Sequence, residues 1–225
     1  LGGFILISYW GSTTILWGVA ACMLGLSLCH GGGKLRLRAA LLALCGLMAV
    51  LAATYGRWHD GRALSHLIES PYNSIRVYEG VDWAQNGRAV RLMATDPGYS
   101  QSGMYLEAPE ELYFRYTQFY ALGPHFVPAA SRVLMLGGGG YSVPKWLLSD
   151  KTPLVKPAEA RVTVVELDPA MTETAQRWFA LRDDPRLTVR HEDARAFLNR
   201  QHNQYDLVFV DVFNSHYAVP FQMGT

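Results

Sequence analysis

The sequence predicts an α/β fold with a parallel sheet in its second half. Short apolar runs suited to strands alternate there with stretches suited to helices. The strand-like runs are 133–136, 162–165, 187–189 and 207–210, and the helix-like stretches are 143–148, 170–179 and 194–201. This alternation favours parallel strands joined by right-handed crossovers. A run of four glycines after the first strand, and an acidic residue near the end of each later strand, add to the prediction.

The N-terminal part of the chain is apolar in two uncharged runs, 4–29 and 39–55, joined by the glycine-rich basic linker 30–38. About 20 apolar residues span the core of a bilayer, so the first run is long enough and the second is marginal. We expect a transmembrane helical hairpin over residues 1–56. The alternative is a signal peptide followed by a buried helix, but a signal peptide has an apolar region of only about 7–15 residues.

The basic residues around the two runs give a weak orientation signal. Those of the linker favour the cytoplasm, which would place the following domain outside, whereas Arg57 and Arg62 favour the reverse. We expect a membrane protein of the bacterial inner-membrane type with its domain facing the cytoplasm, because the ligand implied below is cytosolic. The start at Leu1 and the end at Thr225 suggest a piece of a longer protein.

Between the apolar runs and the α/β part, the pattern predicts a small β-rich lead-in over residues 57–122. Two segments alternate apolar and polar residues as half-buried strands do, and a later one begins with proline and acidic residues as helices do. The expected elements are a polar connector at 57–70, strands at 73–79 and 88–93 around a turn at 81–87, and a helix at 109–122. The α/β domain then occupies residues 123–225.

Charge and cysteine content exclude several functions. The formal net charge is +1, and nucleic-acid binding usually needs a basic face, so no nucleic-acid partner is expected. Cys22, Cys29 and Cys45 all lie in the apolar N-terminal third and lack metal-ligand spacing. We therefore expect buried thiols and no metal site.

The strongest functional signal is the glycine loop in VLMLGGGGYS, residues 133–142. Gly137, Gly138 and Gly139 let the backbone turn sharply and let a ligand approach closely. Ligands of open α/β sheets bind at the carboxyl ends of the strands, which is where this loop lies. The alternative is a flexible turn. Neither a phosphate-binding GxxxxGK[ST] loop nor a GxSxG nucleophile motif is present.

Two acidic residues at strand ends suit a nucleoside. Glu166 ends the second strand, where a carboxylate can accept hydrogen bonds from ribose hydroxyls, whereas Asp168 is better placed to cap the helix that follows. Asp193, followed by Ala194, comes after the third strand. It is expected either to contact an adenine amine or to cap the next helix, and both roles are compatible.

Asp211 ends the fourth strand and faces the same crevice in this topology. A carboxylate there can hold an ammonium group or accept a proton from an amine nucleophile, so it is the candidate catalytic residue. His216 and Tyr217 follow in a loop and are candidates for a lid, with a plain loop as the alternative.

Together these blocks resemble the spermidine synthases, the polyamine aminopropyltransferases. The resemblance runs from about Glu69 to the end, is carried by ESPYNSIRVYE, GGGGYS, VVELDP, EDARAFL and YDLVFVD, and is closest to a membrane-bound branch of the family. It implies a Rossmann-like fold of the S-adenosylmethionine-dependent methyltransferase type, truncated here at its C-terminus. It also implies a possible homodimer.

The resemblance implies transfer of an aminopropyl group from decarboxylated S-adenosylmethionine to a small amine, a polyamine. The nucleoside would contact the glycine loop and the acidic strand ends. Asp211 would hold or deprotonate the amine. The implied nucleoside-binding residues are Gly137, Gly138, Gly139, Glu166, Asp193 and Ala194, and the implied substrate-binding residues are Tyr72, Gln101 and Tyr116.

The chain departs from the family pattern at three positions. Gly140 stands where the family has Asp after three glycines, Asn214 replaces the second Asp of the catalytic loop, and Asn73 replaces an early Gln. Two other functions therefore stay open. One is a methyltransferase that uses S-adenosylmethionine, whose carboxylate Gly140 would tolerate. The other is a non-catalytic nucleoside-sensing module attached to a membrane domain.

Overall fold

The computed structural model describes residues 18–23, 25, 46, 63–95, 99–155, 158–202 and 204–212. The two apolar runs predicted to cross a membrane therefore lie mostly outside the described residues. Within the described part of the chain, no helix has the length and apolar character needed to cross a bilayer.

The first folded unit is an antiparallel sheet with the strand order β1-β2-β3-β4. Its strands are β1 (Ala63–Glu69), β2 (Ser74–Asp82), β3 (Arg88–Ala94) and β4 (Ser102–Tyr105), and the short 3-10 helix η1 (Trp83–Gln85) lies in the β2–β3 turn. Strands β2 and β3 confirm the predicted pair. The turn between them forms because Asp82 accepts a hydrogen bond from the Ala84 N–H and Asn86 adopts a left-handed conformation.

Strands β1 and β4 were not expected from the sequence. The polar connector predicted at 57–70 is wrong over β1, which is an edge strand with a bulge between Leu64 and His66. Its side chains at 65–67 are exposed, and besides pairing with β2 the strand packs Ile68 against the core and the His66 ring against Trp178. Strand β4 is short and buried at every position, which leaves no alternating pattern to recognise.

The helix predicted at 109–122 starts later than expected, at Arg115. Helix α3 (Arg115–Gln118), the 3-10 helix η2 (Phe119–Ala121) and α4 (Leu122–Phe126) follow one another. Glu111, one of the acidic residues expected in its first turn, instead pairs with a strand: Arg88 of β3 donates to both of its carboxylate oxygens, at 2.8 and 3.0 Å. The Tyr113 ring lies directly over Gly103 of β4. These contacts hold residues 109–114 against the sheet.

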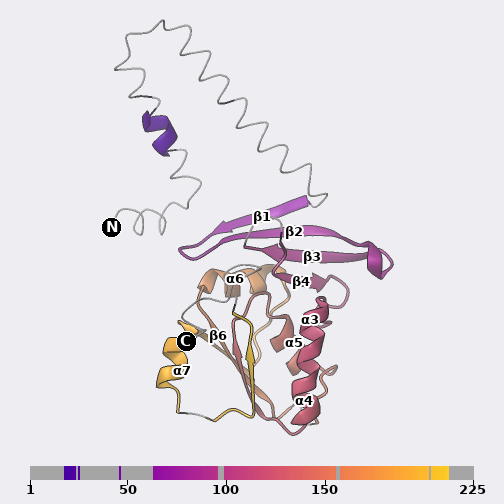
Figure 1. Ribbon diagram of the computed structural model, residues 1–225. Coiled ribbons are helices and arrows are strands. Elements are labelled where there is room, and N and C mark those ends of the chain that lie inside the picture. The colour runs from indigo at the N-terminus through magenta and orange to yellow at the C-terminus, as the bar shows by residue number, and fades with distance from the viewer. Residues whose placement is uncertain are drawn as a thin grey trace, which may run out of the picture.

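The second unit is a parallel sheet with the strand order β7-β6-β5-β8, as the alternation of elements predicts. Its strands are β5 (Arg132–Leu136), β6 (Arg161–Glu166), β7 (Leu187–His191) and β8 (Leu207–Val210), and its helices are α5 (Ser142–Leu148), α6 (Pro169–Trp178) and α7 (Ala194–Arg200). Figure 1 shows the antiparallel sheet lying across one end of this unit, next to α6.

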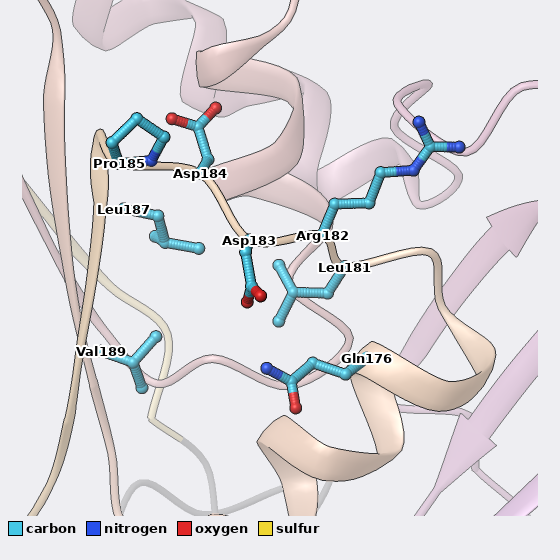
Figure 2. A pocket seen from close by; sticks show the side chains of 8 residues that line it. All are labelled: Gln176, Leu181, Arg182, Asp183, Asp184, Pro185, Leu187 and Val189. Carbon is cyan, nitrogen blue, oxygen red and sulfur yellow. The ribbon is translucent and has the colours of Figure 1, made fainter.

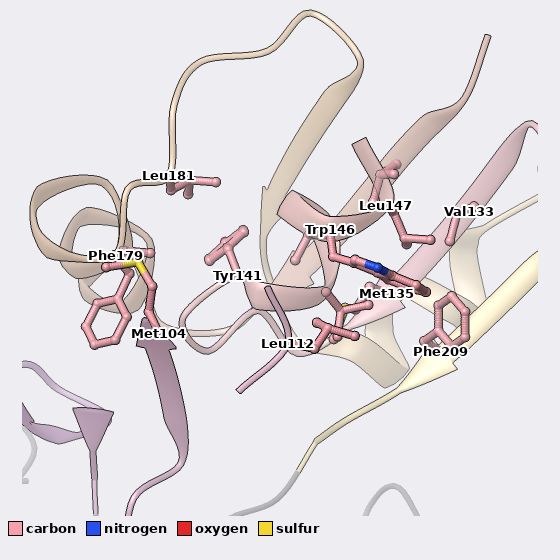
Figure 3. Close-up of a cluster of buried hydrophobic side chains, with 14 of the residues drawn as sticks. Met104, Leu112, Val133, Met135, Tyr141, Trp146, Leu147, Phe179, Leu181 and Phe209 are labelled. Carbon is pink, nitrogen blue, oxygen red and sulfur yellow. The ribbon is translucent and has the colours of Figure 1, made fainter. Parts of the chain in front are cut away.

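Helices cover both faces of the parallel sheet, which explains why β5 is apolar without alternation. Val133 and Met135 point into the larger core, with residues of α5 and α6. Leu134 and Leu136 point to the other face and pack with Phe197 of α7. Figure 3 shows the larger core, in which Trp146 of α5, Met135 of β5 and Phe209 of β8 lie close together.

Candidate functional site at the carboxyl ends of the parallel strands

The glycine loop follows β5 and contacts the end of β8. Gly137 has a φ of 89°, and a Cβ atom built on it would lie 2.2 Å from the Asp211 carbonyl oxygen. Only glycine fits both the positive φ and this close approach. The Asp211 N–H donates to the Leu136 carbonyl at 2.9 Å, so the loop and the candidate catalytic residue form one backbone corner.

The Glu166 carboxylate folds onto the glycine loop. Its Oε2 accepts hydrogen bonds from the N–H groups of Gly138 at 2.8 Å and Gly139 at 3.4 Å, and its Oε1 accepts one from the Asp168 N–H at 2.9 Å. The side chain is 9% exposed. A carboxylate offers about four lone-pair sites, so three backbone donors leave room for one more, such as a ribose hydroxyl. The predicted position of Glu166 beside the loop is confirmed.

Asp168 caps α6, as predicted, and also ties the two sheets together. Its Oδ1 accepts from the Ala170 N–H at 3.0 Å. Its Oδ2 accepts from the Ser70 hydroxyl at 2.5 Å and from the Asn73 amide at 2.8 Å. The residue is 1% exposed, so a buried carboxylate anchors the β1–β2 turn to the end of β6.

Asp193 caps α7, which is one of its two predicted roles. Its Oδ1 accepts from the Ala196 N–H at 2.8 Å, and Ala194 is the buried first residue of the helix. The loop before it is bonded to the end of β6, because the Glu192 N–H donates to the Glu166 carbonyl at 3.2 Å. Asp193 therefore stands at the same edge of the sheet as Glu166, and its contact with a nucleoside stays a prediction.

Asp211 meets two tyrosine hydroxyls from the helical segment 115–121. Tyr116 donates to Oδ2 at 3.2 Å, and Tyr120 also acts on the pKa of the carboxyl group. Burial raises the pKa of Asp211 above its ordinary value, and the two tyrosines oppose the rise. Burial and the nearby carboxylate raise the pKa of Tyr120 to about 12, so both tyrosines are neutral donors at neutral pH.

Gly140, at the position of the acidic family residue, is packed against β4. Its N–H donates to the Ser102 hydroxyl oxygen at 2.8 Å, and a Cβ atom at Gly140 would lie 2.8 Å from the Ser102 Cβ. Any side chain there requires Ser102 to move. The packing of Ser102 against Gly140 is therefore consistent with the lack of a carboxylate side chain at this position.

The three substrate-binding candidates are placed differently. Tyr116 contacts Asp211 directly. Tyr72 is 55% exposed in the β1–β2 turn that Asp168 anchors. Gln101 is exposed and accepts a hydrogen bond from the Thr95 hydroxyl at 3.1 Å. It precedes Ser102, the residue in contact with Gly140. Each thus adjoins the site, while pocket-lining roles for Tyr72 and Gln101 stay predictions.

Three expectations stay untested by this structure. Asn214 and the candidate lid residues His216 and Tyr217 lie outside the described residues. Within the described residues, no three His, Cys, Asp or Glu side chains are grouped so as to hold a metal ion. The expected lack of a metal stays a prediction for the whole chain.

A cavity of about 290 Å³ lies away from these residues, beside the start of β7. Figure 2 shows that the 181–187 loop, Gln176 of α6 and Val189 surround it. Because the strands are parallel, the start of β7 is at the opposite edge of the sheet from Glu166. This cavity therefore does not belong to the candidate site.

Comparison with known proteins gives a consistent picture. No protein-family model matches the chain. The chain is 28% identical over 176 residues to a polyamine aminopropyltransferase of Vibrio vulnificus, covering 76% of this chain and 56% of the relative. It is 37% identical over 83 residues to the eEF1A lysine and N-terminal methyltransferase homolog of Drosophila pseudoobscura pseudoobscura, covering 36% of this chain and 11% of that protein.

The crystal structure of a probable spermidine synthase from Corynebacterium glutamicum superposes with a TM-score of 0.57 and 24% identity, covering 72% of this chain and 57% of that one. The parallel sheet and this structural similarity thus define a Rossmann-like domain. The chain is similar to spermidine synthases, the polyamine aminopropyltransferases, over 76% and 64% of its length in the first two relatives. It spans about half the length of the curated relatives it matches, 56% and 45% of the first two.

Sequence reasoning missed several residues that build the site. Ser102 and the Ser70–Asn73 pair act through contacts 38 and more than 90 residues away in the chain, which no local pattern reveals. Tyr120 had a local signal: it lies four residues after Tyr116, and residues four apart share one face of a helix.

Proposed function

We propose that this chain is the catalytic part of an aminopropyltransferase that uses decarboxylated S-adenosylmethionine and a small amine acceptor, a polyamine. One arrangement carries the proposal. At a single edge of the sheet, Glu166 bonds the glycine loop, and the same loop backs onto Asp211. A nucleoside bound by Glu166 would thereby lie beside the carboxylate that handles the amine.

The residues present suit such a donor. The free lone pair of Glu166 suits a ribose hydroxyl, and Gly139 exposes loop backbone without a side chain. Asp193 and Ala194 stand beside the same edge, where an adenine amine would meet a carboxylate. Tyr72 and Gln101 flank the site from the antiparallel sheet.

The chemistry required of the protein is modest. The acceptor nitrogen attacks the propyl carbon next to the sulfonium sulfur, the C–S bond breaks, and its electron pair returns to sulfur, so a neutral methylthio-nucleoside leaves. The nitrogen loses one proton, and Asp211 is placed to accept it. The raised pKa of this carboxyl group brings it closer to the working pH of a general base. Alignment of donor and acceptor supplies the rest of the rate.

A methyltransferase is the second candidate, supported by one observation. Gly140 carries no carboxylate, and Ser102 fills the space beside it, so nothing anionic from the loop would repel the carboxylate of S-adenosylmethionine.

The test uses purified full-length protein with two labelled donors and diamine or polyamine acceptors. Labelled propylamine on the acceptor supports the main proposal, labelled methyl supports the second, and tight donor binding without turnover supports a sensing module. Asp211→Asn should abolish aminopropyl transfer while donor affinity stays within about twofold. Asp183→Asn, on an exposed loop at the opposite sheet edge, is the matched control and should retain activity.

Membrane attachment, domain boundaries and assembly are also proposals. We propose that residues 1–56 anchor the chain as a helical hairpin in a bilayer, that 57–122 and 123–225 form the lead-in and the nucleoside-binding domain, and that the domain faces the cytoplasm. The uncharged runs at 4–29 and 39–55 support the anchor. Fractionation of cells that express the full-length protein, with carbonate and detergent extraction, tests it. Homodimer formation is tested by sedimentation of the purified protein.

A further inference from the structure

The tyrosines around Asp211 form a pair with a defined geometry. Tyr116 and Tyr120 lie four residues apart, at the α3–η2 junction, and their ring centroids are 6.2 Å apart with the planes at 85°. The Tyr116 hydroxyl donates to the Asp211 carboxylate at 3.2 Å, and Tyr120 lowers the pKa of the same carboxyl group. One turn of helix thus supplies two tyrosines that act on a single acidic side chain.

Packing fixes Tyr120 against the strand that carries Asp211. Its ring lies 5.1 Å from the ring of Phe209. Phe209 and Asp211 are two positions apart along the chain, so their side chains lie on the same side of the extended backbone. Gly123 brings the helical segment close, because a Cβ atom there would lie 2.9 Å from Phe209 Cζ.

The electrostatic surroundings of Asp211 make these donors important. Among the described residues, Tyr116 and Tyr120 are the titratable groups that act on its carboxylate, and no Lys, Arg or His does so. The family's second aspartate in this loop is Asn214 here. In the part of the chain that the structure describes, the groups that act on the carboxylate are therefore neutral hydroxyls.

We propose that Tyr120 is a positioning residue for Asp211, which together with Tyr116 fixes the plane of the carboxylate so that its remaining lone pairs face the acceptor amine. The proposal rests on the proposed function, because it assumes that Asp211 accepts the proton of the amine. Tyr120 does not itself touch the reacting atoms. A hydroxyl that donates to the charged form also stabilises that form.

The test is Tyr120→Phe in the full-length protein, because phenylalanine keeps the ring that packs on Phe209. We expect kcat to fall about 3- to 10-fold and the acid limb of the kcat/KM profile to move up by about 0.5 to 1 pH unit, as for loss of one hydrogen bond to an ionised group. Donor KM should change less than about twofold. Tyr205→Phe, at the opposite end of β8, is the matched control and should leave all three values unchanged.

A readout independent of turnover separates this proposal from the proposed function. Carboxyl NMR titration, with the Asp211 signal assigned through Asp211→Asn, should show a higher Asp211 pKa in Tyr120→Phe than in the native chain. If the Asp211 pKa rises in Tyr120→Phe but the native chain transfers no aminopropyl group, the proposed function is overturned and the positioning role stands. An unchanged carboxyl pKa, or an unchanged kinetic profile in an active enzyme, overturns the positioning role.

Discussion

Gly137 and Asp211 are in backbone contact: a Cβ atom at Gly137 would stand 2.2 Å from the Asp211 carbonyl oxygen. This contact joins the glycine loop to the strand end that carries the candidate catalytic carboxylate. The backbone therefore requires glycine at position 137, apart from any role of this residue in binding a ligand.

Replacement of this glycine should therefore destabilise the fold without any ligand present. Positive φ in a non-glycine residue costs about 1–3 kcal/mol, and the collision with the carbonyl adds to it, so Gly137→Ala should lower the free energy of unfolding by about 3 kcal/mol or more. Gly87→Ala is the control, because Gly87 also has a positive φ, 75°, but its nearest neighbour would be 3.7 Å away. Denaturant unfolding of both variants measures the difference, and equal losses would show that the contact is unimportant.

Glu166 should likewise stabilise the protein when no ligand is bound. Glu166→Gln replaces one acceptor oxygen by an NH2 group that faces backbone N–H donors. Leaving a buried donor without an acceptor costs about 1–3 kcal/mol, so the free energy of unfolding should fall by that amount with no nucleoside present. If denaturant unfolding of the free protein is unchanged and donor affinity alone is lost, Glu166 serves the ligand only.

The packing of Gly140 against Ser102 predicts a coupled pair of substitutions. Gly140→Ala should destabilise because its Cβ would lie 2.8 Å from that of Ser102. Ser102→Gly alone removes the acceptor for the Gly140 N–H, which costs about 1 kcal/mol. In the double variant the collision disappears, so the loss should be smaller than the sum by at least about 1 kcal/mol. Thermal unfolding of the four proteins measures this coupling, and simple additivity would contradict it.

Lys145 predicts a pH dependence of stability above neutrality. Burial lowers its pKa to about 8 from 10.5, and its ammonium donates to the Phe179 carbonyl. Below pH 8 both folded and unfolded chains bind the proton, and the penalty of burying the charge is fully present. Between pH 8 and 10.5 the unfolded chain binds more protons, so the free energy of unfolding rises with pH.

The measurement is the difference in unfolding free energy between the native chain and Lys145→Met at several pH values. Other titrating groups cancel in this difference. The unfolding free energy of the native chain should rise relative to that of Lys145→Met from pH 8 to 10, by on the order of 2 kcal/mol. A difference that stays flat over this range would show that Lys145 keeps an ordinary affinity for its proton.

The elements that the sequence predicted correctly are those whose own residues decide them. Strands β5 and β6 are largely buried apolar runs, and α6 begins at Pro169 behind an Asp cap. The predicted helix at 109–122 was wrong over its first six residues, because Arg88 binds Glu111 and the Tyr113 ring covers Gly103. Such contacts lie 10 to 23 residues apart in the chain and override local preference.

The same distinction applies to the site. Glu166 and Asp211 were predicted from their places at strand ends, because parallel topology brings all such ends to one edge. The contacts from the antiparallel sheet were not predicted, since Ser102 bonds Gly140, and Ser70 and Asn73 bond Asp168, across long separations in the chain. Tyr120 was overlooked although it follows Tyr116 by one helical turn.

The order of apolar runs, glycines and acidic residues is enough by itself to determine the parallel sheet and the edge at which its chemistry lies, since each signal is local and the topology rules are general. The tertiary structure alone decided what each of those residues touches. Glu166 holds the loop, Asp168 holds the other sheet, and Asp211 meets two tyrosines. Those contacts join segments distant in sequence, and their energies depend on distances of a few tenths of an ångström, which no pattern of residue types encodes.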